Sequence, residues 1–404
     1  MLFRSWIDWI HTASDQGALV RDYTKWDNQR GSIAAAVEAL LRGSQIAQTA
    51  PRGPVYINLD AALQEARSEG NLAMPDPQRY AAPVAAPPAI DQVTQAAGWL
   101  SDARQPVILM GRMSRQVQDW QRRVDLAEKI QAGVITDLKN AAAFPTDHPQ
   151  HLGVPGHFLS PQACAAIREA DVILMLDWVD PGGVFKQAFG DQPCHAKVIH
   201  VSLDVHSHRG WSMDMGSLPP ADVYMLCEPD DAVTALLSAC RARAATPWPA
   251  RPLLTAMPQD DVVSIRSVSH ALAQCTQGQE LCIARLPLGW NGAYRDFHHP
   301  MDYLGADGGG GIGAGPGNAI GVALALRDLG SDRLPVALLG DGDFLMGNTA
   351  VWTAVRYGIP LLIIVCNNHS FFNDELHQER VAKERGRPVE NKWIGQRMSE
   401  PEID

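Results

Sequence analysis

The sequence GDGDFLMGNTAVWTAVRYGIPLLIIVCNNHS, residues 340–370, decides how this chain folds. An apolar run over residues 335–339 ends abruptly at the first of these glycines, and a second apolar run over residues 361–366 ends in two asparagines. Helix-forming residues between the runs predict a helix over about residues 348–357. The pattern is therefore strand, turn, helix, strand and turn, with polar side chains at the carboxyl ends of both strands. Ligands of open α/β sheets bind outside these ends.

The polar side chains at the two strand ends are of a kind that binds a hard cation. Asp341 offers a carboxylate oxygen and Asn368 an amide oxygen, which Mg²⁺ accepts together with water and phosphate. Gly340 and Gly342 lack the Cβ atoms that would keep a phosphate away from the backbone, and the N-terminus of the next helix adds partial positive charge. A single such tripeptide is more often an ordinary turn that caps a helix. The pair of ligands at two strand ends favours a cation and phosphate site instead.

A GDG tripeptide followed by a helix and a strand that ends in NN resembles the cofactor motif of thiamine diphosphate (ThDP) enzymes. The resemblance is closest to the acetolactate synthase and benzoylformate decarboxylase branch, and it extends over nearly the whole chain. In that family the Asp, the second Asn and a backbone carbonyl two residues later hold Mg²⁺, which holds the diphosphate of the cofactor. The matching positions are Asp341, Asn368 and Ser370. The resemblance therefore implies ThDP and Mg²⁺ as cofactors.

Further cofactor-binding positions follow from the same resemblance. The segment GADGGGGIGAGPGNAIG, residues 305–321, is similar to a loop in which a Gly carbonyl accepts a hydrogen bond from the 4′-amino group and a bulky apolar residue holds the cofactor bent. The matching positions are Gly310 and Ile312, although Pro316-Gly317 departs from the family pattern of a bulky residue followed by proline. Asp343 stands where the family has a small neutral residue beside the diphosphate. We expect its carboxylate to point away from that anion and to cap a helix.

Along the rest of the chain, helices alternate with short apolar strands, which predicts an α/β protein with parallel, Rossmann-like sheets. Residues 1–78 resemble the C-terminal remnant of the family's pyrimidine-binding (PYR) domain. Pro-rich linkers then separate residues 88–245, similar to its central domain, from residues 253–404, similar to its diphosphate-binding domain. Strands are expected at residues 55–59, 107–110, 134–136, 172–176, 198–203 and 280–286, and helices at residues 32–46 and 262–275.

The catalytic residue is not identified by the sequence. In the family, the glutamate that contacts the N1′ nitrogen of the cofactor lies in an earlier part of the PYR domain, and no residue here matches it. Both ends of the chain look cut when they are set against the family pattern. We therefore expect the chain by itself to be catalytically inert.

Two weaker signals have a structural explanation that is at least as good. Met110-Gly111-Arg112 follows a predicted strand and is the nearest approach to a nucleotide-binding turn. Acetolactate synthases bind FAD in the corresponding domain, and FAD binding by this chain is left open and unsupported. Asp204, His206 and His208 alternate as metal ligands can, although such a pattern is more often a solvated loop.

Two segments beside the expected site also have two interpretations each. The loop at residues 287–292 either touches the diphosphate or is a plain turn. The charged run at residues 371–390 matches a region that helps to roof the active site in the family. It equally fits a solvated amphipathic helix.

Composition and charge limit the classes of partner. The chain has 404 residues, 46% of them hydrophobic, and a formal net charge of −11, which argues against a nucleic-acid backbone or an anionic membrane. Seven cysteines are scattered without a CxxC pair, and residues 1–15 lack the apolar core of a signal peptide. The longest apolar runs are strand-sized. These features predict a cytoplasmic protein that has neither nucleic acid nor membrane as a partner.

The function implied by the resemblance is Mg²⁺- and ThDP-dependent decarboxylation or carboligation of a 2-oxo acid, as in acetolactate synthase. The alternatives are a decarboxylase without ligation, such as benzoylformate decarboxylase, and a non-catalytic ThDP-binding protein. A phosphate-ester enzyme with Asp341 as nucleophile is disfavoured, because no Lys or Arg lies near the GDG turn in the sequence. The family assembles its site from two subunits, which implies a homodimer or homotetramer. Which 2-oxo acid is used is left open.

Overall fold

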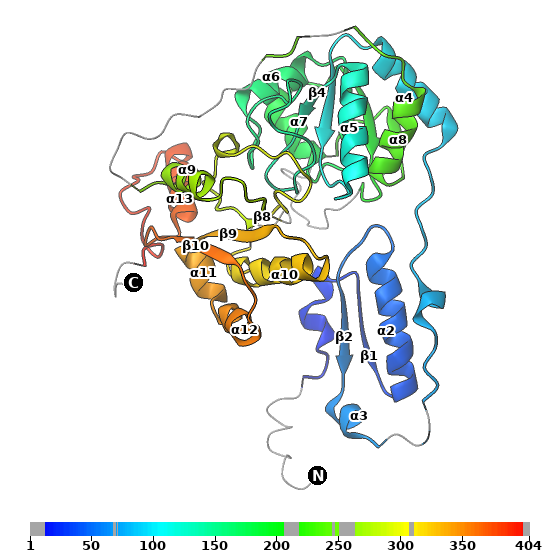
Figure 1. Ribbon diagram of the computed structural model, residues 1–404, viewed down its shortest axis with the longest axis vertical. Helices are drawn as coiled ribbons and strands as arrows, with labels where there is room; N and C mark the ends of the chain where they lie inside the picture. Colours follow the sequence, from blue (N-terminus) through cyan, green and yellow to red (C-terminus); the bar gives the residue numbers. More distant parts are fainter. Residues whose placement is uncertain are drawn as a thin grey trace. The chain divides into compact units, whose positions relative to one another are not determined.

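The computed structural model divides the chain into two compact units (Figure 1). The first comprises Met1–Pro87 with Leu203–His206, and the second comprises Pro88–Ser202 with Ser207–Asp404. The predicted PYR remnant lies in the first unit, and the other two predicted domains lie mainly in the second; their boundaries stay predictions. The structure describes residues 13–67, 70, 72–205, 218–244, 247–249, 263–306 and 311–398.

The first unit is organised around two parallel strands joined by one long helix. The strands pair in register, with Trp26 opposite Val55. The helix follows Ser32, whose side chain accepts a hydrogen bond from the backbone N–H of Ala35 and so caps the helix. The elements are β1 (Trp26–Arg30), α2 (Ile33–Gln48), β2 (Val55–Leu59) and α3 (Ala61–Glu65), with the 3₁₀ helices η1 (Gly17–Leu19), η2 (Arg21–Tyr23) and η3 (Pro77–Tyr80).

A parallel sheet of five strands forms one half of the second unit. In spatial order its strands are β4 (Gly133–Ile135), β3 (Pro106–Met110), β5 (Val172–Leu176), β6 (Lys197–Val201) and β7 (Val223–Met225). Successive side chains enter two different cores, so that Ile108 and Leu174 pack on one face and Val107 and Ile173 on the other. The first face is covered by α4 (Ile90–Asp102), α5 (Val117–Ile130) and α8 (Pro229–Ala239), and the second by α6 (Pro161–Glu169) and α7 (Pro181–Phe189).

A second parallel sheet forms the other half of this unit and carries the expected site. In spatial order its described strands are β10 (Leu362–Cys366), β9 (Leu334–Gly340) and β8 (Leu281–Arg285). On one face, Ala337 and Leu339 pack against Ala319 of the neighbouring helix. On the other face, Val336 and Leu338 enter the same core as the five-stranded sheet. The helices of this half are α9 (Ile265–Cys275), α10 (Gly315–Asp328), α11 (Asp341–Gly347), α12 (Thr349–Tyr357) and α13 (Phe372–Glu384), with the 3₁₀ helix η4 (Gly292–Tyr294).

The sequence predicts most of these elements, and three differences have physical explanations. The expected GDG turn is instead the start of α11, because Gly340 acts as its N-cap and the acidic first turn suits a helix N-terminus. Strand β1 reads WDNQR, which contains neither an apolar run nor a clear alternation. Strand β7 has only three residues, too few for a pattern to be visible.

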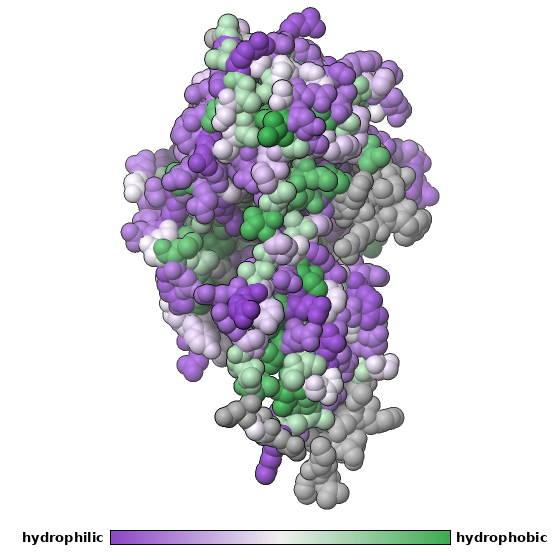
Figure 2. Space-filling view, turned by 90° about the vertical axis from the view of Figure 1, so that its right-hand side faces the viewer, coloured by the Kyte–Doolittle hydropathy of each residue, from purple (hydrophilic) through white to green (hydrophobic). Residues whose placement is uncertain are grey.

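The face of the molecule drawn in Figure 2 is mainly hydrophilic. On the face shown in Figure 2, hydrophilic residues surround several separate apolar patches. Among the described residues, none of the helices is both long and apolar enough to cross a lipid bilayer.

Candidate functional site

The register of the second sheet brings the two predicted cation ligands to one edge. Gly340, the last residue of β9, is the partner of Cys366, the last residue of β10. Asp341 therefore follows one strand end, and Asn368 follows the neighbouring strand end by two residues. Figure 1 shows β9 and β10 side by side, with α11 leaving the end of β9. This is the edge at which the sequence predicts a ligand site.

Asp341 carries a buried oxygen that has no partner. The residue is 7% exposed, and its Oδ1 accepts a hydrogen bond of 2.9 Å from the backbone N–H of Gly342. Its Oδ2 is buried and has no hydrogen-bond partner among the described residues. A buried carboxylate oxygen is costly unless it is paired or coordinates a metal. The donor set at this edge, carboxylate and amide oxygen, therefore fits Mg²⁺.

The loop after β10 is held by the chain that follows α13. Asn368 is exposed, and its Oδ1 accepts a hydrogen bond of 3.2 Å from the backbone N–H of Ser370. His369 between them has a φ of +54°, in the left-handed region, and its carbonyl accepts from the N–H of Met398 at 2.7 Å. Ser370 pairs with Arg397 in an antiparallel bridge. The turn that carries Asn368 and Ser370 thus has a defined backbone.

Ser370 is also fixed by a residue that the sequence did not single out. Its hydroxyl donates a hydrogen bond to Glu375 in the first turn of α13, and both residues are buried. The structure has a helix over this region, Phe372–Glu384, and its buried Glu375 faces the site loop. A buried acid in an otherwise charged run is invisible to periodicity, so the sequence offered no signal for it.

The two glycines of the motif have different surroundings. A Cβ atom at Gly340 would have nothing within 4 Å, so this position leaves open space at the strand end. A Cβ atom at Gly342 would lie 2.2 Å from Cε1 of Phe371, so this glycine makes room for an aromatic ring. Only Gly340 therefore fits the expectation that a glycine opens the backbone to a phosphate.

Asp343 points toward the glycine-rich segment. Its Oδ1 accepts hydrogen bonds from the backbone N–H groups of Gly313, at 2.7 Å, and Gly315, at 3.1 Å. It thus caps the start of α10, whereas the sequence predicted a helix cap without naming the helix. Its Oδ2 lies 3.4 Å from Nε of Arg285 at the end of β8, a residue that the sequence reasoning missed. An arginine that closes an apolar strand, LCIAR, was the available signal.

Of the two positions predicted in the glycine-rich segment, one can be placed. Ile312 is 46% exposed, which leaves its apolar side chain accessible. Gly310 lies outside the described residues.

The weaker signals have structural roles in the described part of the chain. The N–H of Gly111 donates to the carbonyl of Leu176 at 2.9 Å, and the side chain of Arg112 makes two hydrogen bonds of 2.9 Å to Asp177. In the loop at 287–292, Trp290 is 4% exposed and its backbone N–H donates to the carbonyl of Pro287, which is the geometry of a turn. His206 and His208 lie outside the described residues. No group of three His, Cys, Asp or Glu side chains suited to a metal occurs among the residues that the structure describes.

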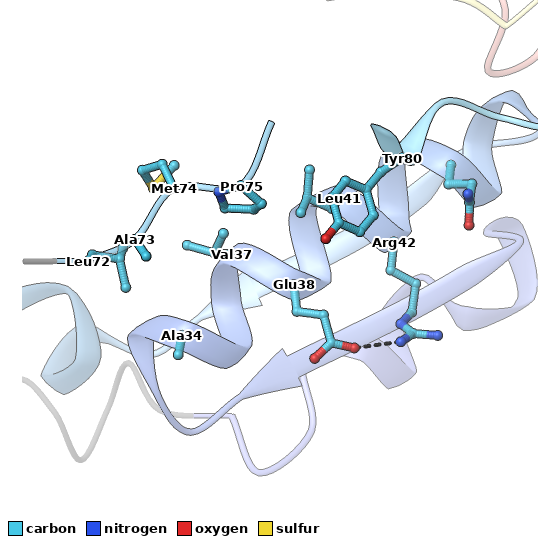
Figure 3. Close-up of a pocket in the computed structure, with 11 residues that line it drawn as sticks. Ala34, Val37, Glu38, Leu41, Arg42, Leu72, Ala73, Met74, Pro75 and Tyr80 are labelled. Carbon is cyan, nitrogen blue, oxygen red and sulfur yellow. Dashed lines mark hydrogen bonds and ion pairs between the residues drawn. The ribbon is translucent and has the colours of Figure 1, made fainter. Parts of the chain in front are cut away.

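The first unit contains a separate cavity of about 600 Å³, beside α2 (Figure 3). Apolar side chains such as Val37, Leu41 and Met74 line it. Glu38 and Arg42 form an ion pair at 2.5 Å along the helix surface. None of the predicted ligand positions lies in this cavity.

Two protein-family models match this chain. One is described as thiamine pyrophosphate enzyme, central domain, and matches residues 93–236. The other is described as thiamine pyrophosphate enzyme, C-terminal TPP binding domain, and matches residues 288–397. Thiamine pyrophosphate (TPP) is another name for ThDP. The two ranges together span more than half of the chain, and the second includes Asp341 and Asn368.

Curated relatives of similar sequence are acetolactate synthases. The large subunit of acetolactate synthase isozyme 1 of Escherichia coli K12 is 26% identical over 341 residues, which are 81% of this chain and 57% of the relative. The acetolactate synthase large subunit of Lactococcus lactis subsp. lactis is 24% identical over 391 residues, which are 92% of this chain and 64% of the relative. The chain thus spans less than two thirds of the length of either relative.

Solved structures share the fold. Benzoylformate decarboxylase from Polynucleobacter necessarius aligns with a TM-score of 0.71 at 19% identity, over 94% of this chain and 68% of that one. The thiamine diphosphate-dependent 4-hydroxybenzoylformate decarboxylase of Rhodococcus jostii RHA1 aligns with a TM-score of 0.70 at 22% identity, over 99% and 72%. The expected α/β class with parallel sheets is confirmed. With both domain models matched and the fold shared, the chain belongs to the family of thiamine pyrophosphate enzymes.

Proposed function

We propose that this protein binds ThDP through Mg²⁺ and uses it to decarboxylate a 2-oxo acid. The observation that carries the proposal is the buried, unpartnered Oδ2 of Asp341 at the strand edge that Asn368 shares. In this proposal Asp341, Asn368 and the backbone carbonyl of Ser370 hold the metal. The open space at Gly340 admits the diphosphate.

When bound, ThDP supplies the electron sink that accepts the bonding electrons as CO₂ leaves a 2-oxo acid. The described residues of the chain bind the metal and contact the cofactor in this proposal. Asp341 and Asn368 fix the metal at the edge of the sheet, and Ile312 offers an accessible apolar surface for the bent cofactor.

Decarboxylation is the step that the two reaction types have in common. The similar curated proteins are named acetolactate synthases, and the similar solved structures are named benzoylformate and 4-hydroxybenzoylformate decarboxylases. After CO₂ has left, a transferase joins the remaining acyl unit to a second carbonyl compound, whereas a lyase releases it as an aldehyde. We favour carboligation of the acetolactate synthase type, because the acetolactate synthases are 26% and 24% identical to this chain and the two decarboxylases are 19% and 22% identical.

Assembly and location are part of the same proposal. A groove of about 900 Å³ runs beside α10, and Gly317 and Gly321 expose the helix backbone along it. A second copy of the chain would cover this groove in a homodimer or homotetramer. All seven cysteines are free thiols, which supports a reducing compartment such as the cytoplasm.

Product analysis tests the reaction. The protein is incubated with ThDP, Mg²⁺ and either pyruvate or benzoylformate, and CO₂, aldehyde and acyloin are quantified. Because the chain alone is expected to be inert without the glutamate that contacts N1′, the assay includes a PYR domain that carries this glutamate, added from another ThDP enzyme. With that domain present we expect CO₂ release that depends on both cofactors, with acyloin as the main product from pyruvate. Binding of ThDP without CO₂ release from any 2-oxo acid would favour a non-catalytic ThDP-binding protein. Aldehyde as the sole product would favour a lyase.

A further inference from the structure

A buried ion pair joins the strand end of β8 to the first turn of α11. The side chains of Arg285 and Asp343 are 7% and 13% exposed, and Nε of the arginine lies 3.4 Å from Oδ2 of the aspartate. Taking two charges out of water costs free energy that an ion pair recovers only when further hydrogen bonds satisfy both groups. The hydrogen bonds that each side chain makes to other residues therefore show what the pair is built to hold.

Both side chains turn to the same backbone segment. The carboxylate of Asp343 accepts from the N–H groups of Gly313 and Gly315, and Nη2 of Arg285 donates to the carbonyl of Gly311 at 3.1 Å. Gly315 is the first residue of α10, so the carboxylate also meets the positive end of that helix. Three alternate residues of one segment are thus tied to one ion pair.

Glycines at two positions of the segment allow its backbone to lie against the ion pair. Gly313 has a φ of +94°, which disfavours a side chain at this position. A Cβ atom at Gly315 would lie 2.5 Å from Oδ2 of Asp343. The backbone can therefore approach the carboxylate closely only because both residues are glycine.

One hydrogen-bond donor of Arg285 is unused among the described residues. Its Nη1 is buried and has no hydrogen-bond partner among the described residues. The guanidinium charge offsets that of Asp343, which stands two residues after the proposed metal ligand Asp341. Without Arg285, the aspartate would add an uncompensated negative charge beside a site for a diphosphate.

We propose that Arg285 and Asp343 are positioning residues that hold the glycine-rich segment 311–315, and with it Ile312, in place for the cofactor. The pair also keeps the site free of excess negative charge. This inference rests on the proposed function, because the cofactor is the group that the segment would receive. The alternative is an ion pair that only stabilises the fold.

A double-mutant cycle separates the two explanations. Arg285→Met removes every donor and the positive charge, Asp343→Asn removes the negative charge at nearly constant size, and the third variant combines both. Affinity for Mg²⁺ and ThDP is measured by calorimetry, and amide exchange at Gly313 and Gly315 is measured without cofactor. Lys197 and Asp222 form a more exposed ion pair beside the other sheet and supply a control, since Asp222 pairs with Lys197 and accepts from the N–H of Val198, both at 2.9 Å.

We expect Arg285→Met to weaken Mg²⁺–ThDP binding by about tenfold or more. The double variant should recover only the part of this loss that is due to the excess negative charge, because the hydrogen bond from Arg285 to Gly311 stays lost. Asp343→Asn should speed exchange at Gly313 and Gly315. Lys197→Met and Asp222→Asn should change neither affinity nor exchange at these glycines.

A folded Arg285→Met variant that binds Mg²⁺–ThDP like the wild type would overturn the inference. Loss of affinity that the second substitution does not recover at all would overturn the charge compensation. If the wild type itself does not bind Mg²⁺–ThDP, the proposed function fails, and unchanged exchange in Asp343→Asn would then overturn the positioning role as well. Should Arg285→Met fail to fold, Arg285→Lys replaces it, because lysine keeps the charge and loses the fork that reaches both Asp343 and Gly311.

Discussion

Gly340 and Cys366 are register partners at the ends of neighbouring parallel strands, and this pairing delivers Asp341 and Asn368 to the same edge of the sheet. The two side chains need no contact with each other to lie at this edge, because the register of the strands alone brings them there. The position of the site is therefore set first by the backbone and only second by side-chain contacts.

The two glycines of the GDG motif should respond differently to alanine. Gly342→Ala puts a Cβ atom into the ring of Phe371, and we expect a loss of about 1–3 kcal/mol in the free energy of unfolding. Gly340→Ala meets nothing within 4 Å, so stability should stay within about 1 kcal/mol of the wild type. The affinity of Gly340→Ala for ThDP should nevertheless fall on the order of tenfold, since the new methyl group occupies the open space through which we propose that the diphosphate reaches the backbone. Urea unfolding and calorimetry measure the two quantities; equal ThDP affinity of Gly340→Ala and the wild type would contradict the phosphate approach.

Glu375 should support the metal-site loop without touching the metal. Glu375→Ala leaves the buried hydroxyl of Ser370 without its acceptor, and we expect a loss of about 1.5–3 kcal/mol in unfolding free energy. Glu375→Gln keeps an acceptor and should lose less. The neighbouring Asp374→Ala serves as control for a general effect on the helix N-terminus. Chemical denaturation of the three variants checks the order, and a Glu375→Ala protein as stable as Asp374→Ala would contradict it.

The pH dependence of stability should contain a contribution from Glu379. Hydrogen bonds from Lys383 and Lys392 lower the pKa of this half-buried carboxyl to about 2 from an ordinary 4.5. Since the pKa is lower in the folded state, the stabilisation is present above about pH 4.5 and is lost as the pH falls toward 2. Glu379→Gln should therefore differ from the wild type at pH 6 and converge with it at low pH, with a small difference because the partner Lys383 is exposed to solvent. Thermal unfolding across this range checks the sign, and a difference that grows on acidification would contradict it.

Assembly should depend on the groove beside α10. Gly321→Arg adds a long charged side chain at a position that has no atoms within 4 Å of its Cβ. We expect the wild type to sediment as a dimer or larger species and the variant to shift toward monomer. Asp328→Ala, with its side chain 73% exposed near the end of the same helix, should leave the sedimentation unchanged. A wild-type protein that sediments as a monomer would contradict the proposed assembly.

The sequence predicts the parts of this structure that local pattern controls. Strands β9 and β10 were visible as apolar runs with polar ends, and the meeting of Asp341 and Asn368 follows from parallel pairing. Long-range partners were not visible: nothing in the order of residues links Arg285 to Asp343, or Gly342 to the ring of Phe371. Strand β1 was missed because its sequence is polar, and its place is set by pairing with β2.

Calorimetric titration of ThDP with and without Mg²⁺ tests the central claim, the metal site at Asp341, most directly. The wild type is compared with Asp341→Ala and with the control Asp328→Ala. We predict Mg²⁺-dependent binding by the wild type and the control, and no measurable binding by Asp341→Ala at the same protein concentration. Unchanged ThDP affinity of a folded Asp341→Ala protein in the presence of Mg²⁺ would contradict the assignment.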